Sequence, residues 1–216
     1  MGRPKQIQSG RRGAILLLGP TGSGKTPLGE LLAAKGLWGR RCLHFDFGMI
    51  LRQHAGKEGA PGPLTPVERG LLAQVLESGA LLEDGHFPIA RKLLESFLSV
   101  RQAQPADWVV LNGLPRHAGQ ARALEPLLAM KAVVQLACTP AVAWERIRAN
   151  TGGDRAGRAD DTAEDVRRRT EIFRARTAPL LDYYRSAGTP ILKVEVGVQT
   201  TPREVWTQLQ ARAGAP

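Results

Sequence analysis

The sequence predicts an α/β fold of three layers, α/β/α, in which a five-stranded parallel sheet is covered by helices on both faces. Five short apolar runs of strand length occur along the chain, and segments of helical character separate them. A glycine-rich loop joins the first run to the first helical segment. Short continuous apolar runs are typical of strands buried on both faces, and intervening helices allow parallel pairing. At 216 residues, the chain is expected to form a single domain.

The expected strands cover residues 14–18, 41–46, 107–111, 132–138 and about 190–196. Three helix starts are marked by a threonine followed by proline, at Thr65, Thr139 and Thr201. A glutamate three residues after Thr65 and after Thr201 predicts a capping box at each. Residues 54–63 and 151–161 are rich in glycine and polar side chains, which indicates loops.

The composition excludes several classes of protein. No apolar run approaches the roughly 20 residues that a membrane span needs. Residues 1–12 are basic and polar, and we expect a flexible arm there rather than a secretory signal, which indicates the cytoplasm. Cys42 and Cys138 lie in apolar runs without a CxxC pattern, so they are interpreted as buried thiols in a reducing compartment.

The loop at residues 19–26, GPTGSGKT, fits the pattern G-x-x-x-x-G-K-[ST] and lies between an expected strand and an expected helix. Glycines let backbone N–H groups converge on phosphate oxygens, and the helix N-terminus adds partial positive charge. Lys25 is expected to reach the β- and γ-phosphates of ATP, and the Thr26 hydroxyl to bind Mg²⁺. The predicted nucleotide-binding residues of the loop are Gly19, Gly22, Ser23, Gly24, Lys25 and Thr26.

Four further motifs follow the loop. They are GMILR at 48–52, SGALLED at 78–84, LNGLPR at 111–116 with Gln120 four residues on, and RADD at 158–161 before a helix with arginines at 167–169. In this order, the chain resembles the adenylate kinase family of nucleoside monophosphate kinases, from about residue 14 to the final helix.

The resemblance implies transfer of the γ-phosphoryl group of ATP to a nucleoside monophosphate, most simply AMP. Donor and acceptor bring several negative charges together, so catalysis by such enzymes is mostly positioning and electrostatic stabilisation. The resemblance assigns this work to Lys25, Arg116, Arg158 and Arg169.

The resemblance also implies binding roles. Arg146 would pack on the donor adenine, and Arg52 and Arg116 would hold the acceptor phosphate. Gln120 would contact the acceptor base. The expected acceptor site is completed by Phe47, Gly48 and Gly113, and the expected metal site consists of Thr26 and Asn112.

Two parts of the domain at residues 13–216 would move by this resemblance: an acceptor-binding subdomain at 47–82 and a short lid at 150–158. Lid closure would exclude water from the reaction. The net charge of +10 permits a nucleic-acid partner, but the motif positions favour a cleft that holds several phosphates of small nucleotides. No membrane partner is expected, and a monomer is favoured.

The chain also departs from the family pattern. Phe47 and Met49 are apolar where the family has polar groups, which leaves UMP, CMP or another small molecule open as the acceptor. Asn112 replaces an aspartate that holds a Mg²⁺-bound water, and its amide carbonyl could still accept a hydrogen bond from that water. Asp46, at the end of the second expected strand, could substitute for the lost carboxylate, but its interpretation as a turn or cap residue is favoured. A nucleotide-binding module without catalysis, with a nucleic-acid partner, is the alternative from another class.

Overall fold

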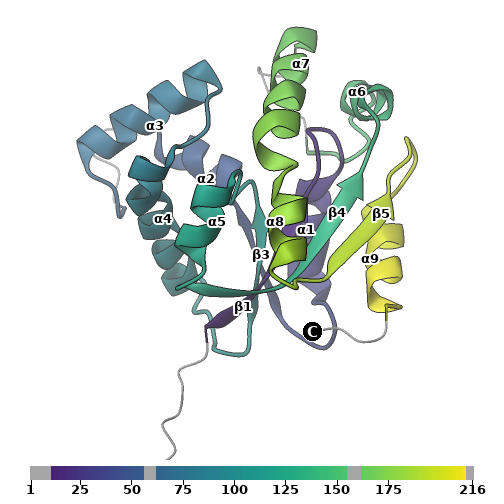
Figure 1. Cartoon of the computed structure of the whole chain (residues 1–216), viewed down its shortest axis with the longest axis horizontal. Helices are drawn as coiled ribbons and strands as arrows, with labels where there is room; N and C mark the ends of the chain where they lie inside the picture. The colour runs from purple at the N-terminus through teal and green to yellow at the C-terminus, as the bar shows by residue number, and fades with distance from the viewer. Residues whose placement is uncertain (1–10, 56–61, 155–161, 213–216) are drawn as a thin grey trace, which may run out of the picture.

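The structure is a computed structural model, and it describes residues 11–55, 62–154 and 162–212. Its centre is a five-stranded sheet, entirely parallel, with strand order β2-β3-β1-β4-β5 (Figure 1). The strands are β1 (Arg12–Leu18), β2 (Cys42–Asp46), β3 (Trp108–Asn112), β4 (Leu128–Ala137) and β5 (Ile191–Glu195). The predicted fold class is confirmed.

Helices cover both faces of the sheet, and the three whose starts the sequence marked at Thr65, Thr139 and Thr201 begin directly after those residues. They are α1 (Lys25–Lys35), α2 (Phe47–His54), α3 (Pro66–Ser78), α4 (Phe87–Val100), α5 (Ala118–Leu124), α6 (Pro140–Arg148), α7 (Ala163–Ile172), α8 (Leu180–Ser186) and α9 (Pro202–Gln210). Two short turns join some of them, η1 (Asp84–His86) and the π-helical η2 (Phe173–Thr177). The capping boxes predicted at Thr65 and Thr201 are both present.

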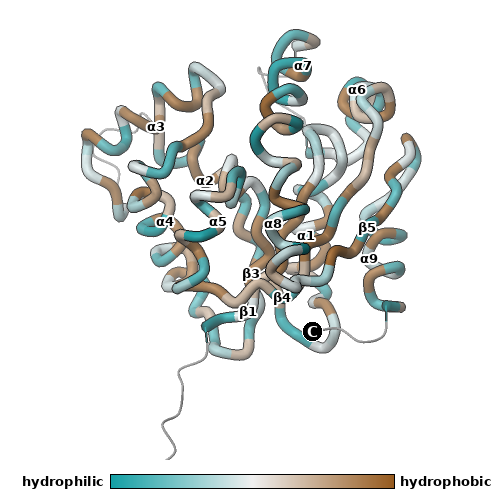
Figure 2. Tube along the Cα trace, in the orientation of Figure 1, coloured by the Kyte–Doolittle hydropathy of each residue, from teal (hydrophilic) through white to brown (hydrophobic). Residues whose placement is uncertain are grey.

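Both faces of the sheet are apolar because helices cover both. In β1, Leu16 and Leu18 point into a cluster with α4, α5 and α8, while Ile15 and Leu17 point into another with α1 and α9. Successive side chains of a strand alternate between faces, so an unbroken apolar run is what a doubly covered strand requires. Figure 2 shows this as hydrophobic colouring along the central strands.

The parallel order places the carboxyl ends of all strands at one edge of the sheet. The loops after β1, β2 and β3 therefore meet there, and α3 and α7 rise above this edge (Figure 1). The register of β2 and β3 pairs Asp46 directly with Asn112, so the last residues of these strands are neighbours. Ligands of open α/β sheets bind at such an edge.

The last helix is tied to the first. The indole nitrogen of Trp38 donates to the Leu209 carbonyl at 2.9 Å, and that of Trp206 donates to the Gly36 carbonyl at 2.9 Å. The apolar side of α9, with Val205 and Leu209, packs in the same cluster as α1. Among the described residues, no helix has both the length and the apolar character that a membrane crossing requires.

His44, on β2, makes stability depend on pH. Its ring lies against α1, where a Cβ at Gly29 would come within 2.2 Å of it, and its Nε2 has no hydrogen-bond partner among the described residues. Burial lowers the pKa of His44 below its ordinary value of 6.5. The unfolded chain therefore takes up this proton at a higher pH than the folded chain, and protonation favours unfolding.

We expect the free energy of unfolding to fall as the pH drops below about 6.5, by up to about 1.4 kcal/mol per pH unit from this group, until the pKa of the folded state is reached. Urea unfolding at pH 7.5 and pH 5.5 measures the effect, and a His44→Phe variant should lose less stability than the wild type between the two. His86→Gln, at an exposed histidine, is the control. Equal pH dependence of the wild type and His44→Phe would contradict the assignment.

Candidate active site

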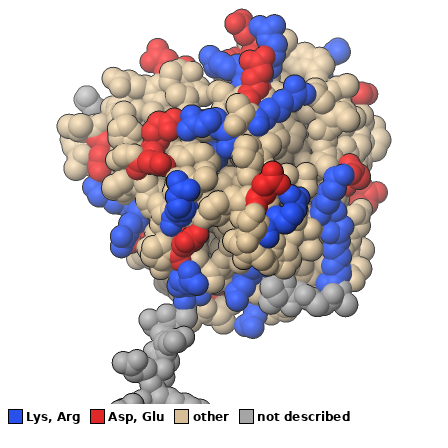
Figure 3. Space-filling view, viewed as in Figure 1, with Lys and Arg blue, Asp and Glu red and all other residues tan. Residues whose placement is uncertain are grey.

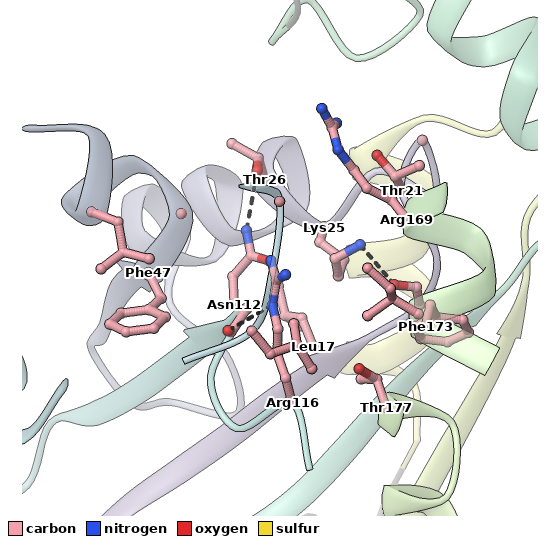
Figure 4. Close-up of a pocket in the computed structure, with 18 of the residues that line it drawn as sticks. Leu17, Thr21, Lys25, Thr26, Phe47, Asn112, Arg116, Arg169, Phe173 and Thr177 are labelled. Carbon is pink, nitrogen blue, oxygen red and sulfur yellow. Dashed lines mark hydrogen bonds between the residues drawn. The ribbon is translucent and has the colours of Figure 1, made fainter. Parts of the chain in front are cut away.

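A cavity of about 320 Å³ opens at the carboxyl edge of the sheet (Figure 4). Most of the residues predicted for the site line it together. They are Gly19, Gly22, Gly24, Lys25, Thr26, Phe47, Gly48, Arg52, Asn112, Gly113, Arg116, Gln120, Arg146 and Arg169. Ser23, also a residue of the loop, is buried and does not line the cavity. Residues 155–158 of the expected lid, Arg158 among them, lie outside the described residues.

The glycine-rich loop is shaped by its own contacts. Gly22 has φ +82°, and a Cβ there would lie 2.6 Å from the Ala143 carbonyl oxygen, so a side chain would not fit. The Ser23 hydroxyl donates to the Pro20 carbonyl at 2.9 Å. Lys25 Nζ donates to the carbonyl oxygens of Gly19 at 2.8 Å and Pro20 at 2.7 Å, which places its ammonium group beside the loop it follows.

Thr26, Asp46 and Asn112 form a polar triad at the start of α1. The Thr26 hydroxyl donates to Asp46 Oδ2 at 2.8 Å, and Asn112 Nδ2 donates to the same carboxylate oxygen at 2.8 Å and to Thr26 Oγ1 at 3.1 Å. Asp46 Oδ1 accepts from the Met49 backbone N–H at 2.9 Å and so caps α2. The interpretation of Asp46 as a cap residue is confirmed but incomplete, because its second oxygen belongs to the site. The amide nitrogen of Asn112, rather than its carbonyl, faces Thr26.

The turn after β3 presents Arg116 to the cavity. Gly113 has φ +83°, and its carbonyl oxygen accepts from Arg116 Nε at 3.1 Å. Gln120 supports this turn: its Oε1 accepts from the Arg116 backbone N–H at 2.8 Å, and its Nε2 donates to the Leu82 carbonyl at 2.6 Å. Both ends of the Gln120 amide are therefore engaged, so contact with an acceptor base would need one of these bonds to be exchanged, and that role stays a prediction.

Phe47 and Met49 differ sharply in their surroundings. Phe47 is only 3 % exposed, and its ring stacks on Phe45 with centroids 5.9 Å apart. Met49 is 41 % exposed on the outer side of α2. Phe47 therefore forms an apolar wall of the cavity, at the edge seen in Figure 4, and does not project into it as a free stacking platform.

Positive charge converges on the cavity. Partial loss of hydration in the cavity lowers the pKa of Arg116; the carboxylate of Asp46 raises it, and the charges of Arg169 and Arg52 lower it. An arginine remains charged despite such a shift, so Arg52, Arg116 and Arg169 bring three positive charges to the region around Asp46. Figure 3 shows further Lys and Arg side chains on α7 at the top of the view, interspersed with acidic ones. Such a field suits a ligand that carries several negative charges.

Arg146 is buried on the opposite wall and bonds to carbonyl groups. Its Nε donates to the Gly22 carbonyl at 3.1 Å, and its Nη1 donates at 2.8–2.9 Å to three carbonyls of the loop between β5 and α9, those of Gly197, Val198 and Thr200. Burial lowers the pKa of Arg146. The guanidinium group thus clamps the phosphate loop to the loop between β5 and α9, which the sequence did not indicate.

The structure adds residues that sequence reasoning missed. Arg168, Phe173 and Thr177 line the cavity from α7 and η2. Phe173 and Thr177 are the first and last residues of the π-helical turn, and both lie at the cavity (Figure 4). In the sequence, only the three arginines at 167–169 indicated that this part of the chain would line the site. Arg168 also pairs with Asp165 at 2.9 Å.

A glycine-rich loop before a helix, a hydroxyl beside a carboxylate and converging arginines define a P-loop phosphotransferase.

No protein-family model matches the chain. It is 32 % identical over 203 residues to an adenylate kinase of Synechococcus sp. (91 % of this chain, 96 % of the relative). It is 36 % identical over 181 residues to one of Stenotrophomonas maltophilia (81 % and 87 %), and 32 % identical over 205 residues to one of Thermus thermophilus (93 % and 97 %). The chain belongs to the adenylate kinase family, the ATP- and Mg²⁺-dependent nucleoside monophosphate kinases.

Proposed function

We propose that this chain transfers the γ-phosphoryl group of ATP to AMP. The observation that carries the proposal is that the phosphate loop and Arg116 line the same cavity of about 320 Å³. A donor phosphate on the loop and an acceptor phosphate on Arg116 would then be close enough to react. The similarity to adenylate kinases over most of the chain supports AMP as the acceptor.

On the donor side, the phosphate loop and the first turn of α1 would hold the triphosphate. Lys25 would exchange the Gly19 and Pro20 carbonyls for phosphate oxygens. Arg146 already borders the loop at Gly22 and would present its guanidinium face to the donor base. The hydroxyl of Thr26 and the carboxylate of Asp46 are oxygen donors that fit Mg²⁺, which would neutralise charge on the phosphates when bound.

On the acceptor side, Arg52 and Arg116 would bind the monophosphate. A Cβ at Gly48 would lie 3.6 Å from Arg52 Nη1, so the guanidinium group of Arg52 lies over the start of α2, across from the Gly113 turn. Arg169 on α7 would add charge as the transferred group passes between the nucleotides, and Arg158 would do the same. Guanidinium groups suit this work because they stay charged and match phosphate geometry.

A second acceptor has a specific observation in its favour. Phe47 is buried and apolar, and the amide of Gln120 is bonded at both ends, so neither residue offers an unused polar group to an acceptor base. An apolar wall discriminates between bases weakly compared with a site of matched hydrogen bonds. Transfer to UMP, CMP or another phosphorylated small molecule is therefore the alternative within the same fold and mechanism.

Turnover with single acceptors tests the proposal. We expect ADP formation from ATP and Mg²⁺ to have a kcat/KM for AMP about tenfold or more above those for CMP, UMP, GMP and dTMP. Preference for another monophosphate would move the substrate and keep the mechanism. No turnover with any of the five would contradict the proposal and favour a binding module, whose affinity for nucleic acid would fall steeply with salt.

The proposal also covers the location and the oligomeric state of the protein. We place it in the cytoplasm as a monomer, because nucleotides are its substrates and both cysteines, Cys42 and Cys138, are free thiols. Nucleic acid is not part of the proposal. Residues 47–82 would act as the acceptor-binding part and residues 150–158 as the lid, within one domain.

A further inference from the structure

We propose that Asp46, at the end of β2, is the carboxylate that anchors Mg²⁺ beside the phosphate loop, with Asn112 as its positioning residue. The inference deepens the proposed function and rests on it for the use of Mg²⁺ with ATP. The negative charge of the metal site would then come from Asp46, and the Asn112 amide would hold the oxygen atoms of Asp46 and Thr26 in place.

The first argument is the direction of the Thr26 hydroxyl. A hydroxyl that ligates a cation offers an oxygen lone pair to it, so its hydrogen has to point elsewhere. In this structure the hydrogen is directed to Asp46 Oδ2 at 2.8 Å. Asp46 therefore orients Thr26 for a cation in the cavity, as the hydrogen-bond partner of a metal ligand does.

The second argument is the amount of charge. Asp46 is 5 % exposed, and among the described residues it is the carboxylate within hydrogen-bond distance of Thr26. Glu77, Asp154 and Asp165 also line the cavity, and Asp165 is paired with Arg168 at 2.9 Å. No group of three or more His, Cys, Asp and Glu side chains in the described part of the chain could hold a metal alone. The site thus combines one hydroxyl, one carboxylate and the oxygens that nucleotide and water would bring, which suits Mg²⁺.

The third argument is the role of Asn112. Its Nδ2 donates to both Asp46 Oδ2 and Thr26 Oγ1, so one amide group fixes both oxygens. A carboxylate in its place would lie beside that of Asp46, and two such groups in contact cannot both ionise at neutral pH. The amide therefore keeps the site at a single negative charge.

The register of the strands gives a sharp test. Asp46 and Asn112 are directly paired neighbours, so exchanging them moves the carboxylate by one strand and keeps the same groups. In the double variant Asp46→Asn/Asn112→Asp, the amide at position 46 can still accept from the Met49 N–H, because asparagine caps helices as well as aspartate does. The carboxylate at position 112 can then accept from the Thr26 hydroxyl.

The measurement is the dissociation constant of Mn²⁺, as a spectroscopic substitute for Mg²⁺, from the protein–ATP complex, followed by electron paramagnetic resonance with no acceptor present. We expect Asp46→Asn to weaken Mn²⁺ binding about 10- to 100-fold, the range typical for partners of metal ligands. The double variant should recover most of that loss. Asp107→Asn, at another buried carboxylate distant from the cavity, should bind Mn²⁺ like the wild type.

Unchanged Mn²⁺ affinity in Asp46→Asn would overturn the inference, as would a double variant no better than Asp46→Asn while both melt like the wild type. The outcome is separate from that of the proposed function. Because the measurement needs no acceptor, a failure of every monophosphate in the turnover assay would remove the kinase proposal and leave this result standing. Conversely, rapid turnover with AMP and an Asp46→Asn variant of normal Mn²⁺ affinity would remove only the role of Asp46.

Discussion

Replacement of Lys25 by alanine is expected to lower kcat with ATP and AMP by about 10³-fold. The ammonium group lies beside the carbonyls of Gly19 and Pro20, inside the loop where the triphosphate would bind. Removing one fixed donor or cation that stabilises developing charge typically costs about 10²–10³ in rate, and loss of a cation at a transferred phosphoryl group can cost more. The folded state loses hydrogen bonds of the ammonium group to two loop carbonyls, so the melting temperature should change little.

Lys35→Ala is the matched control, because Lys35 ends the same helix and its ammonium group lies over the ring of Trp206, away from the cavity. We expect near wild-type turnover from it. Steady-state kinetics at saturating ATP and AMP, with a thermal melt of each variant, make the comparison. Lys25→Ala turning over like Lys35→Ala would show that the loop does not place this lysine on the reacting phosphate.

Replacement of Arg116 by alanine is expected to lower kcat/KM for the acceptor by about 10²–10³-fold, with a smaller effect on the KM for ATP. Arg116 faces the cavity from the turn after β3, held through its Nε by the Gly113 carbonyl. Arg116→Lys should recover only part of the loss, because an ammonium group cannot reproduce the two-pronged contact of a guanidinium group with phosphate.

Arg122→Ala, at an exposed position of α5, removes the same charge from a residue that does not line the cavity and serves as the control. The KM values for ATP and for the acceptor, measured separately, distinguish the two sides of the cavity. A rise in the KM for ATP alone would assign Arg116 to the donor, contrary to our proposal.

Most of the fold could be predicted because each part of it has a local cause. The five strands are apolar runs that need cover on both faces, and the helix starts at Thr65 and Thr201 satisfy their own first-turn N–H groups. The loop at 19–26 and the turn at Gly113 have backbone shapes that need glycine. Residues of the site that belong to such local motifs were found in advance.

The residues that were missed depend on distant contacts. The pairing of Asp46 with Asn112 follows from the register of β2 and β3, which is fixed by packing along the whole strands. Treating a cap and a site residue as exclusive alternatives was also unsound, because a carboxylate has two oxygens and Asp46 uses one for each purpose. The π-helical turn at η2 likewise leaves no pattern in a short sequence.

The bonds of Arg146 have a consequence for the order in which the molecule is made. The phosphate loop is synthesised first, but the carbonyls of Gly197, Val198 and Thr200 that hold the clamping guanidinium follow only after the last strand of the sheet, β5. The helix α9, which packs on α1 through Trp38 and Trp206, emerges later still. A nascent chain therefore carries the phosphate-binding sequence long before it has a finished pocket for ATP, and its affinity for the nucleotide should appear only once residues 197–210 have left the ribosome.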